Sequence, residues 1–115
     1  MRSFKKFLPL AVMAALGATA VTAQTSDFPA KDKTITIVVP FTAGGPTDRV
    51  ARDLAEALRK PLGGATIVID NAAGAGGSIG ANKVAKANPD GYTLLLHHIG
   101  MATMPTLVRN IPFKV

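Results

Sequence analysis

The chain of 115 residues contains no cysteine, so it has no disulfide bridges and no metal sites built on thiolates. Its core must therefore hold through packing alone. Aromatic residues are few, with five Phe and one Tyr, and the Lys and Arg residues form no run interleaved with them. Nucleic-acid binding loses its main support without such a basic and aromatic surface.

The fingerprints of nucleotide binding are also missing. A G-x-G-x-x-G pattern starting at Gly74 reaches Ile79 where the third glycine belongs. No glycine is followed by Lys-Ser or Lys-Thr, which a phosphate-binding P-loop requires. The acidic residues are dispersed and there are only two histidines. We therefore expect no nucleotide, metal or other cofactor.

Long hydrophobic runs are absent apart from residues 7–21, which are apolar and rich in alanine. This run is shorter than the ~20 residues needed to cross a bilayer, and it contains a proline. A positively charged segment with Arg2, Lys5 and Lys6 precedes it, and small residues at a cleavage site follow it. Residues 1–23 are therefore predicted to be a signal peptide.

Cleavage is expected near Ala23, with an alternative site at Ala20, which leaves residues 24–115 as an exported, periplasmic part. The segment 1–23 carries three of the 13 basic residues and none of the seven acidic ones. Its removal lowers the formal net charge from +6 to +3. A mildly basic protein of this kind suits anionic small molecules.

Three short apolar segments have the composition of buried strands: Thr34–Val39, Thr66–Ile69 and Tyr92–Leu96. Helical patterns separate them, one beginning at Pro46 and ending before Pro61, the other spanning Ser78–Ala87. This alternation predicts an α/β fold with a right-handed β-α-β-α-β unit and a parallel sheet. Residues 101–115, with two prolines, are expected to form a loop without a third crossover helix.

The first helix has one apolar stripe that is expected to face the sheet. Its members recur at helical spacing: Val50, Ala51, Leu54, Ala55 and Leu58. Charged residues such as Arg52 are expected to face away from the sheet. Asp48 lies in the first turn, where a carboxylate complements the helix dipole, and this is interpreted as its main role.

Glycines gather where the first two strands end. Ligands of parallel α/β sheets bind beyond the carboxyl ends of the strands, and Gly44-Gly45 and Gly74–Gly77 follow two such ends. Backbone N–H groups at a helix start, beside glycines that admit a close ligand, form an anion site. The alternative is that the glycines only permit tight turns. Both interpretations stay open at this point.

Two further features suggest chemistry. Residues 76–80 match G-x-S-x-G, so an exported α/β hydrolase with Ser78 as nucleophile is an alternative. Two features weigh against it: the serine follows a long glycine loop, and a catalytic triad needs partners from later in the chain. His97 and His98 end the third strand and are expected to point to opposite faces, which disfavours a shared metal ion. We expect His98 to donate a hydrogen bond to a ligand, and His97 to be packed or exposed.

An ordered set of motifs between Phe28 and Phe113 resembles one known family. The motifs are Ile35–Phe41, Ala43–Asp48, Val50–Arg52, Asn71, Gly74–Gly80, Val84-Ala85, Pro89–Leu95 and Pro112-Phe113. In these residues the chain resembles the substrate-binding receptors of tripartite tricarboxylate transporters, also called Bug receptors.

The resemblance implies a two-lobed periplasmic-binding-protein fold of type II-like architecture, with residues 24–115 forming the N-terminal portion of the first lobe. It implies a receptor, not an enzyme, that binds a small carboxylate such as a dicarboxylate or tricarboxylate. Membrane subunits of a tripartite transport system would be its partners. Main-chain groups, partly through water, would hold the carboxylate. The ligand-binding residues that the resemblance carries over are Phe41, Ala43, Gly44, Gly45, Asn71, Gly76, Gly77, Ser78, His98 and Gly100.

Two departures from the family pattern qualify this implication. Asn71-Ala72-Ala73 stands where the family usually has Arg-Pro after the asparagine, which predicts a looser second loop. Family members are also several times longer than residues 24–115. We therefore expect a truncated chain without the second lobe, which binds ligand weakly or not at all by itself. A fragment without function, prone to pair or aggregate through uncovered apolar surface, is the remaining alternative.

Overall fold

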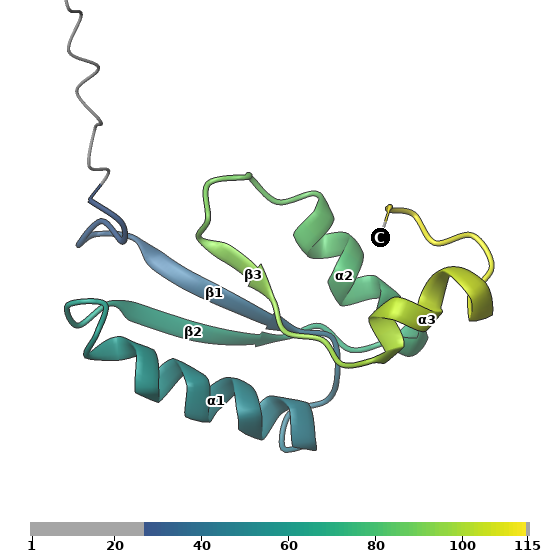
Figure 1. Cartoon of the computed structure of the whole chain (residues 1–115), viewed down its shortest axis with the longest axis horizontal. Coiled ribbons are helices and arrows are strands. Elements are labelled where there is room, and N and C mark those ends of the chain that lie inside the picture. The colour runs from purple at the N-terminus through teal and green to yellow at the C-terminus, as the bar shows by residue number, and fades with distance from the viewer. Residues whose placement is uncertain (1–26, 115) are drawn as a thin grey trace, which may run out of the picture.

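A computed structural model of the chain describes residues 27–114, and Figure 1 shows their arrangement. The elements are β1 (Thr34–Val39), α1 (Pro46–Arg59), β2 (Thr66–Asn71), the 3-10 turn η1 (Ala75–Gly77), α2 (Ser78–Ala85), β3 (Thr93–Leu95) and α3 (Gly100–Leu107). The predicted signal peptide, residues 1–23, lies outside the described residues. None of the helices within residues 27–114 has the length and apolar character that crossing a membrane requires.

The sheet has three parallel strands in the order β2-β1-β3, so β1 is central. Thr34 pairs with Thr66 at the start of β2, and Thr36 pairs with Thr93 at the start of β3. The predicted α/β class and the parallel β-α-β-α-β order are confirmed. β2 runs two residues beyond the predicted Ile69, because the ladder with β1 continues until Val39 meets Asn71.

One face of the sheet packs on α1, which lies along β1 and β2 in Figure 1. Alternate β1 residues supply this side of the core, as the period of two in a strand requires. The fully buried members of this core are Ile35, Ile37, Val39, Ala51, Ala55 and Ile67. The predicted apolar stripe of α1 is wrong in part, because Val50 and Leu54 are 57% and 39% exposed. The small side chains of Ala51 and Ala55 let α1 pack closely on the sheet. The adjacent residues Val50 and Leu54 lie toward solvent instead.

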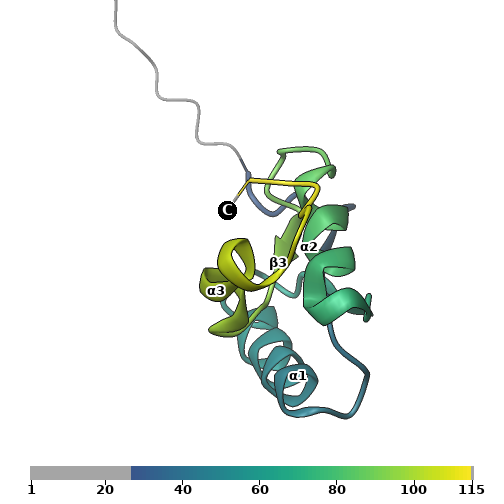
Figure 2. The same cartoon turned by 90° about the vertical axis from the view of Figure 1, so that its right-hand side faces the viewer.

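The opposite face of the sheet packs on α2, and here glycine sets the distance. A Cβ at Gly80 would lie 2.6 Å from the Cβ of Pro40 and 2.9 Å from the Ala72 carbonyl oxygen. Val38 on β1 and Ala81 on α2 are both buried. The two helices therefore cover opposite faces of one sheet, and the chain passes across β1 from β2 to reach β3 (Figures 1 and 2).

The helix α3 corrects the prediction that residues 101–115 form only a loop. Its first turn is tightened by bonds from Met101 N to His98 O and from Ala102 N to Ile99 O, both 3.0 Å. Met104 is 2% exposed, and its burial anchors the helix against the molecule. Pro105 lies inside α3, where the missing N–H removes one bond from a helix that tertiary packing already holds.

Candidate functional site

The carboxyl ends of the three strands place three loops along one edge of the sheet. The segment after β1 (residues 40–45) lies centrally, and the segments after β2 (72–77) and β3 (96–99) flank it. The chain leaves β1 toward β2 on one side and returns to β3 on the other. This reversal beside the central strand is where ligands bind in open α/β sheets.

Asp48 organises the first of these loops. Its side chain is 2% exposed, and its two carboxylate oxygens accept four hydrogen bonds. The Gly44 amide donates one at 2.8 Å, and Arg52 donates two, from Nε at 2.9 Å and Nη2 at 3.1 Å. The fourth comes from Asn71 Nδ2, at 2.9 Å. The acid thus does more than complement the helix dipole, and Arg52, which is exposed as predicted, also pairs with it.

These hydrogen bonds fix the ionisation of the pair. Donation from Arg52, then from Gly44 and Asn71, holds the pKa of the Asp48 carboxyl well below its usual range, against the smaller opposing effect of burial. The same carboxylate raises the pKa of the Arg52 guanidinium. Asp48 is therefore a carboxylate at any pH near neutrality, and its charge is matched by a neighbouring cation.

Asn71 joins the ends of β1 and β2. Besides donating to Asp48, its Nδ2 lies 3.2 Å from the Phe41 carbonyl oxygen, while its Oδ1 lies 3.5 Å from Arg52 Nη2. The Asn71 side chain, a predicted ligand contact, is thus occupied in tying the first loop to the second strand. The four-residue spacing of Asp48 and Arg52 is a signal that the sequence contains. The partnership with Asn71 spans 23 residues and has no local signal.

The second loop is shaped by backbone conformation. Gly74, Gly76 and Gly77 all have positive φ, and Gly77, at +97°, packs against the third strand end. A Cβ at Gly77 would lie 2.6 Å from His97 Nε2 and 3.4 Å from the Phe41 ring. Ser78 begins α2 and is 9% exposed. The turn η1 separates it from β2, so it does not occupy the sharp strand-to-helix elbow of a hydrolase nucleophile.

Three rings meet where β3 ends. The Phe41 ring stacks on His98 with centroids 4.5 Å apart and contacts His97 edge-on at 5.2 Å. The expectation that the two histidines point to opposite faces is wrong, because the chain stops being a strand at Leu95 and turns toward α3. Even so, no three His, Cys, Asp or Glu side chains within residues 27–114 gather closely enough to hold a metal ion.

His98 presents a hydrogen-bond donor. The Gly100 amide donates to His98 Nδ1 at 2.9 Å, so the neutral imidazole carries its proton on Nε2. His98 is exposed, whereas His97 is half-buried and its Nε2 has no partner among the described residues. Of the two histidines, His98 is therefore the one that offers a donor to solvent.

A hollow of about 470 Å³ lies at this edge, and the residues that line it come from the first loop, the start of α1 and the end of β3. They are Phe41, Thr42, Gly45, Pro46, Thr47 and His98. Sequence reasoning missed Thr47, although a first-turn position after Pro46 has an N–H that the helix cannot use. The hollow is therefore open to the N-terminus of a 14-residue helix.

The amides of the predicted binding residues fall into two groups. Those of Gly44, Gly45, Gly77, Ser78 and Gly100 donate within the protein, to Asp48 and to nearby backbone or ring atoms. Within the described part of the chain, the amides of Ala43 and Gly76 donate to no other group, and the same holds for Thr47, which was not predicted. The glycines thus shape the loops, and the amides open to a ligand belong mostly to their neighbours.

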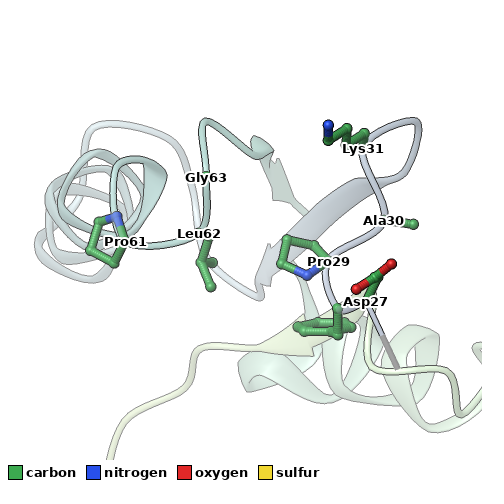
Figure 3. Close-up of a pocket in the computed structure, with 8 residues that line it drawn as sticks. Asp27, Pro29, Ala30, Lys31, Pro61, Leu62 and Gly63 are labelled. Atoms are coloured by element: carbon green, nitrogen blue, oxygen red, sulfur yellow. The ribbon is translucent and has the colours of Figure 1, made fainter. Parts of the chain in front are cut away.

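A second hollow, of about 500 Å³, lies at the opposite edge of the sheet and is shown in Figure 3. Its lining comes from the segment before β1, including Pro29 and Lys31, and from the α1–β2 connection, including Pro61 and Leu62. Both segments precede strands, so this hollow faces the amino ends of the sheet. No helix N-terminus within residues 27–114 opens onto it, and ligands of parallel sheets bind at the other edge.

Comparison with known proteins identifies the class. The sequence profile described as "Tripartite tricarboxylate transporter family receptor" matches residues 50–115, more than half of the chain. A UPF0065 protein from the TAR-I ttuE-ttuC' intergenic region of Agrobacterium vitis is 54% identical over 80 residues, which are 70% of this chain and 23% of that protein. The chain therefore belongs to the family of tripartite tricarboxylate transporter receptors.

Solved structures agree in fold. The periplasmic binding protein BugD is 52% identical, with a TM-score of 0.68 over 72% of this chain and 27% of BugD. MatC from Rhodopseudomonas palustris, solved with bound malate, is 44% identical, with a TM-score of 0.66 over 70% of this chain and 28% of MatC. The members of this family are solute receptors and not enzymes, which removes the hydrolase alternative for Ser78. The chain spans about a quarter of the length of these relatives.

Proposed function

We propose that this protein is an exported solute receptor that holds a small carboxylate, a dicarboxylate or tricarboxylate, for a tripartite transport system. Membership of the receptor family supports the receptor role. Malate bound to MatC supports a carboxylate as ligand. The observation that carries the proposal is the hollow at the carboxyl edge, which is lined by His98, by the N-terminus of α1 and by Thr47, whose amide has no partner among the described residues.

Electrostatics favour an anion in this hollow. The first turn of α1 carries a partial positive charge, and the Thr47 amide faces outward within it. Asp48, a buried acid near it, is neutralised by Arg52 and accepts two further hydrogen bonds, from Gly44 and Asn71. A carboxylate oxygen in the hollow would therefore meet the Thr47 N–H and the His98 Nε2–H, without an unmatched negative charge nearby.

The proposed site residues divide by role. Phe41, Ala43, Gly76 and His98 are proposed to contact the ligand, directly or through ordered water. The remaining predicted residues are proposed to set the loop shapes that bring those contacts together, and these are Gly44, Gly45, Asn71, Gly77, Ser78 and Gly100.

Domain organisation and location complete the proposal. Residues 1–23 are proposed as a signal peptide cleaved near Ala23, and residues 24–115 as part of one lobe of a two-lobed periplasmic receptor. The length of BugD and MatC relative to this chain supports a second lobe in receptors of this kind. Because the hollow at the carboxyl edge is open, the other end of the ligand would be held by that second lobe. The membrane subunits of the transporter are the proposed partners.

A titration of malate into ¹⁵N-labelled protein, followed by amide chemical shifts, tests the proposal. With one lobe only, binding is expected to be millimolar, about 4 kcal/mol of free energy. The amides of Ala43, Thr47 and Gly76 and the His98 ring are expected to shift together. The dimethyl ester of malate, which has no carboxylate charge, serves as the matched control and should leave these signals in place.

A hybrid joins this segment to the rest of a receptor whose structure is known. Replacing the equivalent segment of MatC by residues 28–113 of this chain is expected to give a receptor that binds malate more tightly than the segment alone. Shifts confined to the amino-edge hollow, or no shifts with malate in either protein, would contradict the proposed function.

A further inference from the structure

We propose that Asp48 is the positioning residue of the carboxylate site, since it ties the first loop to the second strand through Gly44, Arg52 and Asn71. This inference rests on the proposed function, because positioning has a purpose only if the loop binds a ligand. Asp48 itself is not proposed to touch the ligand.

Burial and bonding show what Asp48 is for. A carboxylate that is 2% exposed is stable only when its charge is paired and its oxygens are satisfied, and here four donors satisfy them. Arg52 contributes two of these bonds in a forked geometry while remaining 56% exposed. Arg52 thus stabilises the Asp48 carboxylate, and the Asp48 carboxylate in turn fixes the position of the loop through the Gly44 amide.

The partners of Asp48 come from three different segments. Gly44 lies in the loop after β1, Arg52 one helical turn further along α1, and Asn71 at the last residue of β2. Asn71 then donates to the carbonyl of Phe41, on the other side of the same loop. Because both ends of the loop are tied to one cluster, the Ala43 amide between them is held in one orientation.

A helix-stabilising acid would not need this arrangement. Complementing the dipole requires only a negative charge in the first turn, and a cap requires only bonds to helix amides. Here Asp48 accepts a hydrogen bond from the Gly44 amide, which lies before the helix. It accepts another from the side-chain amide of Asn71, which is 23 residues further along the sequence. Oδ2 accepts from the loop and Oδ1 accepts from the end of β2. Asp48 therefore cross-links two segments of the chain.

The carboxylate also determines which amides a ligand can use. By accepting the Gly44 amide, Asp48 removes this donor from the anion site. A ligand carboxylate then meets amides that have no partner among the described residues, such as those of Ala43 and Thr47, on the first-loop side. Without Asp48, the loop would be free to offer its Gly44 amide instead, so the set of donors and the fit of the ligand would both change.

The substitution Asp48→Asn tests this inference because it keeps the size of the side chain and removes its charge. Two readouts are needed: amide hydrogen exchange without ligand, and the malate titration. Exchange at residues 41–45 is expected to accelerate by about tenfold or more, since bonds to a charged acceptor are lost, while β1 keeps its protection. The malate concentration at half-maximal shift is expected to rise by a similar factor of about ten.

Two further variants separate positioning from general stability. Glu56→Gln removes a carboxylate from the same helix, one that is 76% exposed and pairs with Arg59, and it should change neither readout. Asn71→Ala leaves Asp48 paired with Arg52 but cuts the link to β2. It should reproduce the faster exchange of residues 41–45, and combining it with Asp48→Asn should add little.

The outcomes are distinguishable. If Asp48→Asn folds, binds malate as the unaltered chain does and leaves exchange at residues 41–45 unchanged, the positioning role is wrong. If Asp48→Asn does not fold, Asn71→Ala and Arg52→Lys decide the question by the same two readouts, because Arg52→Lys keeps the charge and loses the fork. Absence of malate binding by both the unaltered chain and the MatC hybrid would contradict the proposed function, whereas the exchange result would still test the cross-link.

Discussion

The two glycine loops look alike in sequence but are held by different forces. The loop after β1 is held by polar bonds, with the Gly44 amide on Asp48 and open space where a Gly44 side chain would be. The loop after β2 is held by close packing, with Gly77 pressed against His97 and, in the helix that follows the loop, Gly80 against Pro40. A change of charge should therefore loosen the first loop, and a change of volume should disrupt the second.

The largest effect is expected from Gly77→Ala in the second loop. The left-handed conformation costs an alanine about 1–2 kcal/mol. Crowding against His97 Nε2, 2.6 Å from the new Cβ, adds about 1–3 kcal/mol, because His97 is itself packed on Phe41. Urea unfolding should show a loss of roughly 3 kcal/mol.

The matched controls for Gly77→Ala are Gly76→Ala and Gly44→Ala. Both positions have positive φ and no atom within 4 Å of a new Cβ. Each should lose only the conformational cost of about 1–2 kcal/mol. Equal losses at all three positions would show that packing does not distinguish the loops.

Acid should loosen the first loop before the second. The pKa of Asp48 is lowered in the folded state, so its contribution to stability is fully present above the unfolded pKa of about 4 and is lost as pH falls below it. Amide exchange at residues 41–45, corrected for intrinsic rates, should therefore rise at acid pH in the unaltered chain. In Asp48→Asn the corrected exchange should already be raised at neutral pH and depend less on pH. A parallel acid response in both proteins would assign the effect to other carboxylates.

A smaller effect is expected from His98→Phe, which keeps a ring against Phe41 and removes the donor at the hollow. Loss of one neutral hydrogen bond to a ligand costs about 1 kcal/mol, so malate affinity should fall about fivefold. The unfolding free energy should change little, since His98 is exposed. The same shift titration measures the affinity, and an unchanged midpoint would remove His98 from the proposed contacts.

The smallest effect is expected from Ser78→Ala. Ser78 starts α2 and no part of the proposed site depends on a reactive hydroxyl, so malate affinity should change by less than about twofold. Hydrolysis of an activated ester by the unaltered chain should not exceed that of the variant. A loss of ester turnover on this substitution would revive the hydrolase interpretation of residues 76–80.

Local patterns predicted most of the fold. β1 was predicted with its observed bounds, because its β-branched run is closed by Pro40. α1 begins at Pro46 as predicted, since proline suits the first helical turn. α3 was missed because Pro105 dominates the local pattern, whereas the burial of Met104 is a tertiary fact.

The site was only partly predictable from the sequence. The meeting of two glycine loops at one edge follows from the order of strands and helices. The roles of Asp48 and Asn71 do not, because their bond joins segments 23 residues apart. Likewise, the Gly44 amide donates a hydrogen bond whereas the Ala43 amide does not. This difference depends on the orientation of the Asp48 side chain, which cannot be predicted from the spacing of residues in the sequence.

The most direct test of the central claim is a crystal structure of the MatC hybrid carrying residues 28–113, grown with malate. We expect a ligand carboxylate at the carboxyl edge, within hydrogen-bond distance of the Ala43 and Gly76 amides or of waters bound to them, with Asp48 still paired with Arg52 and Asn71. Malate bound at the amino-edge hollow beside Pro29 and Leu62, or a carboxylate held by neither loop, would contradict it.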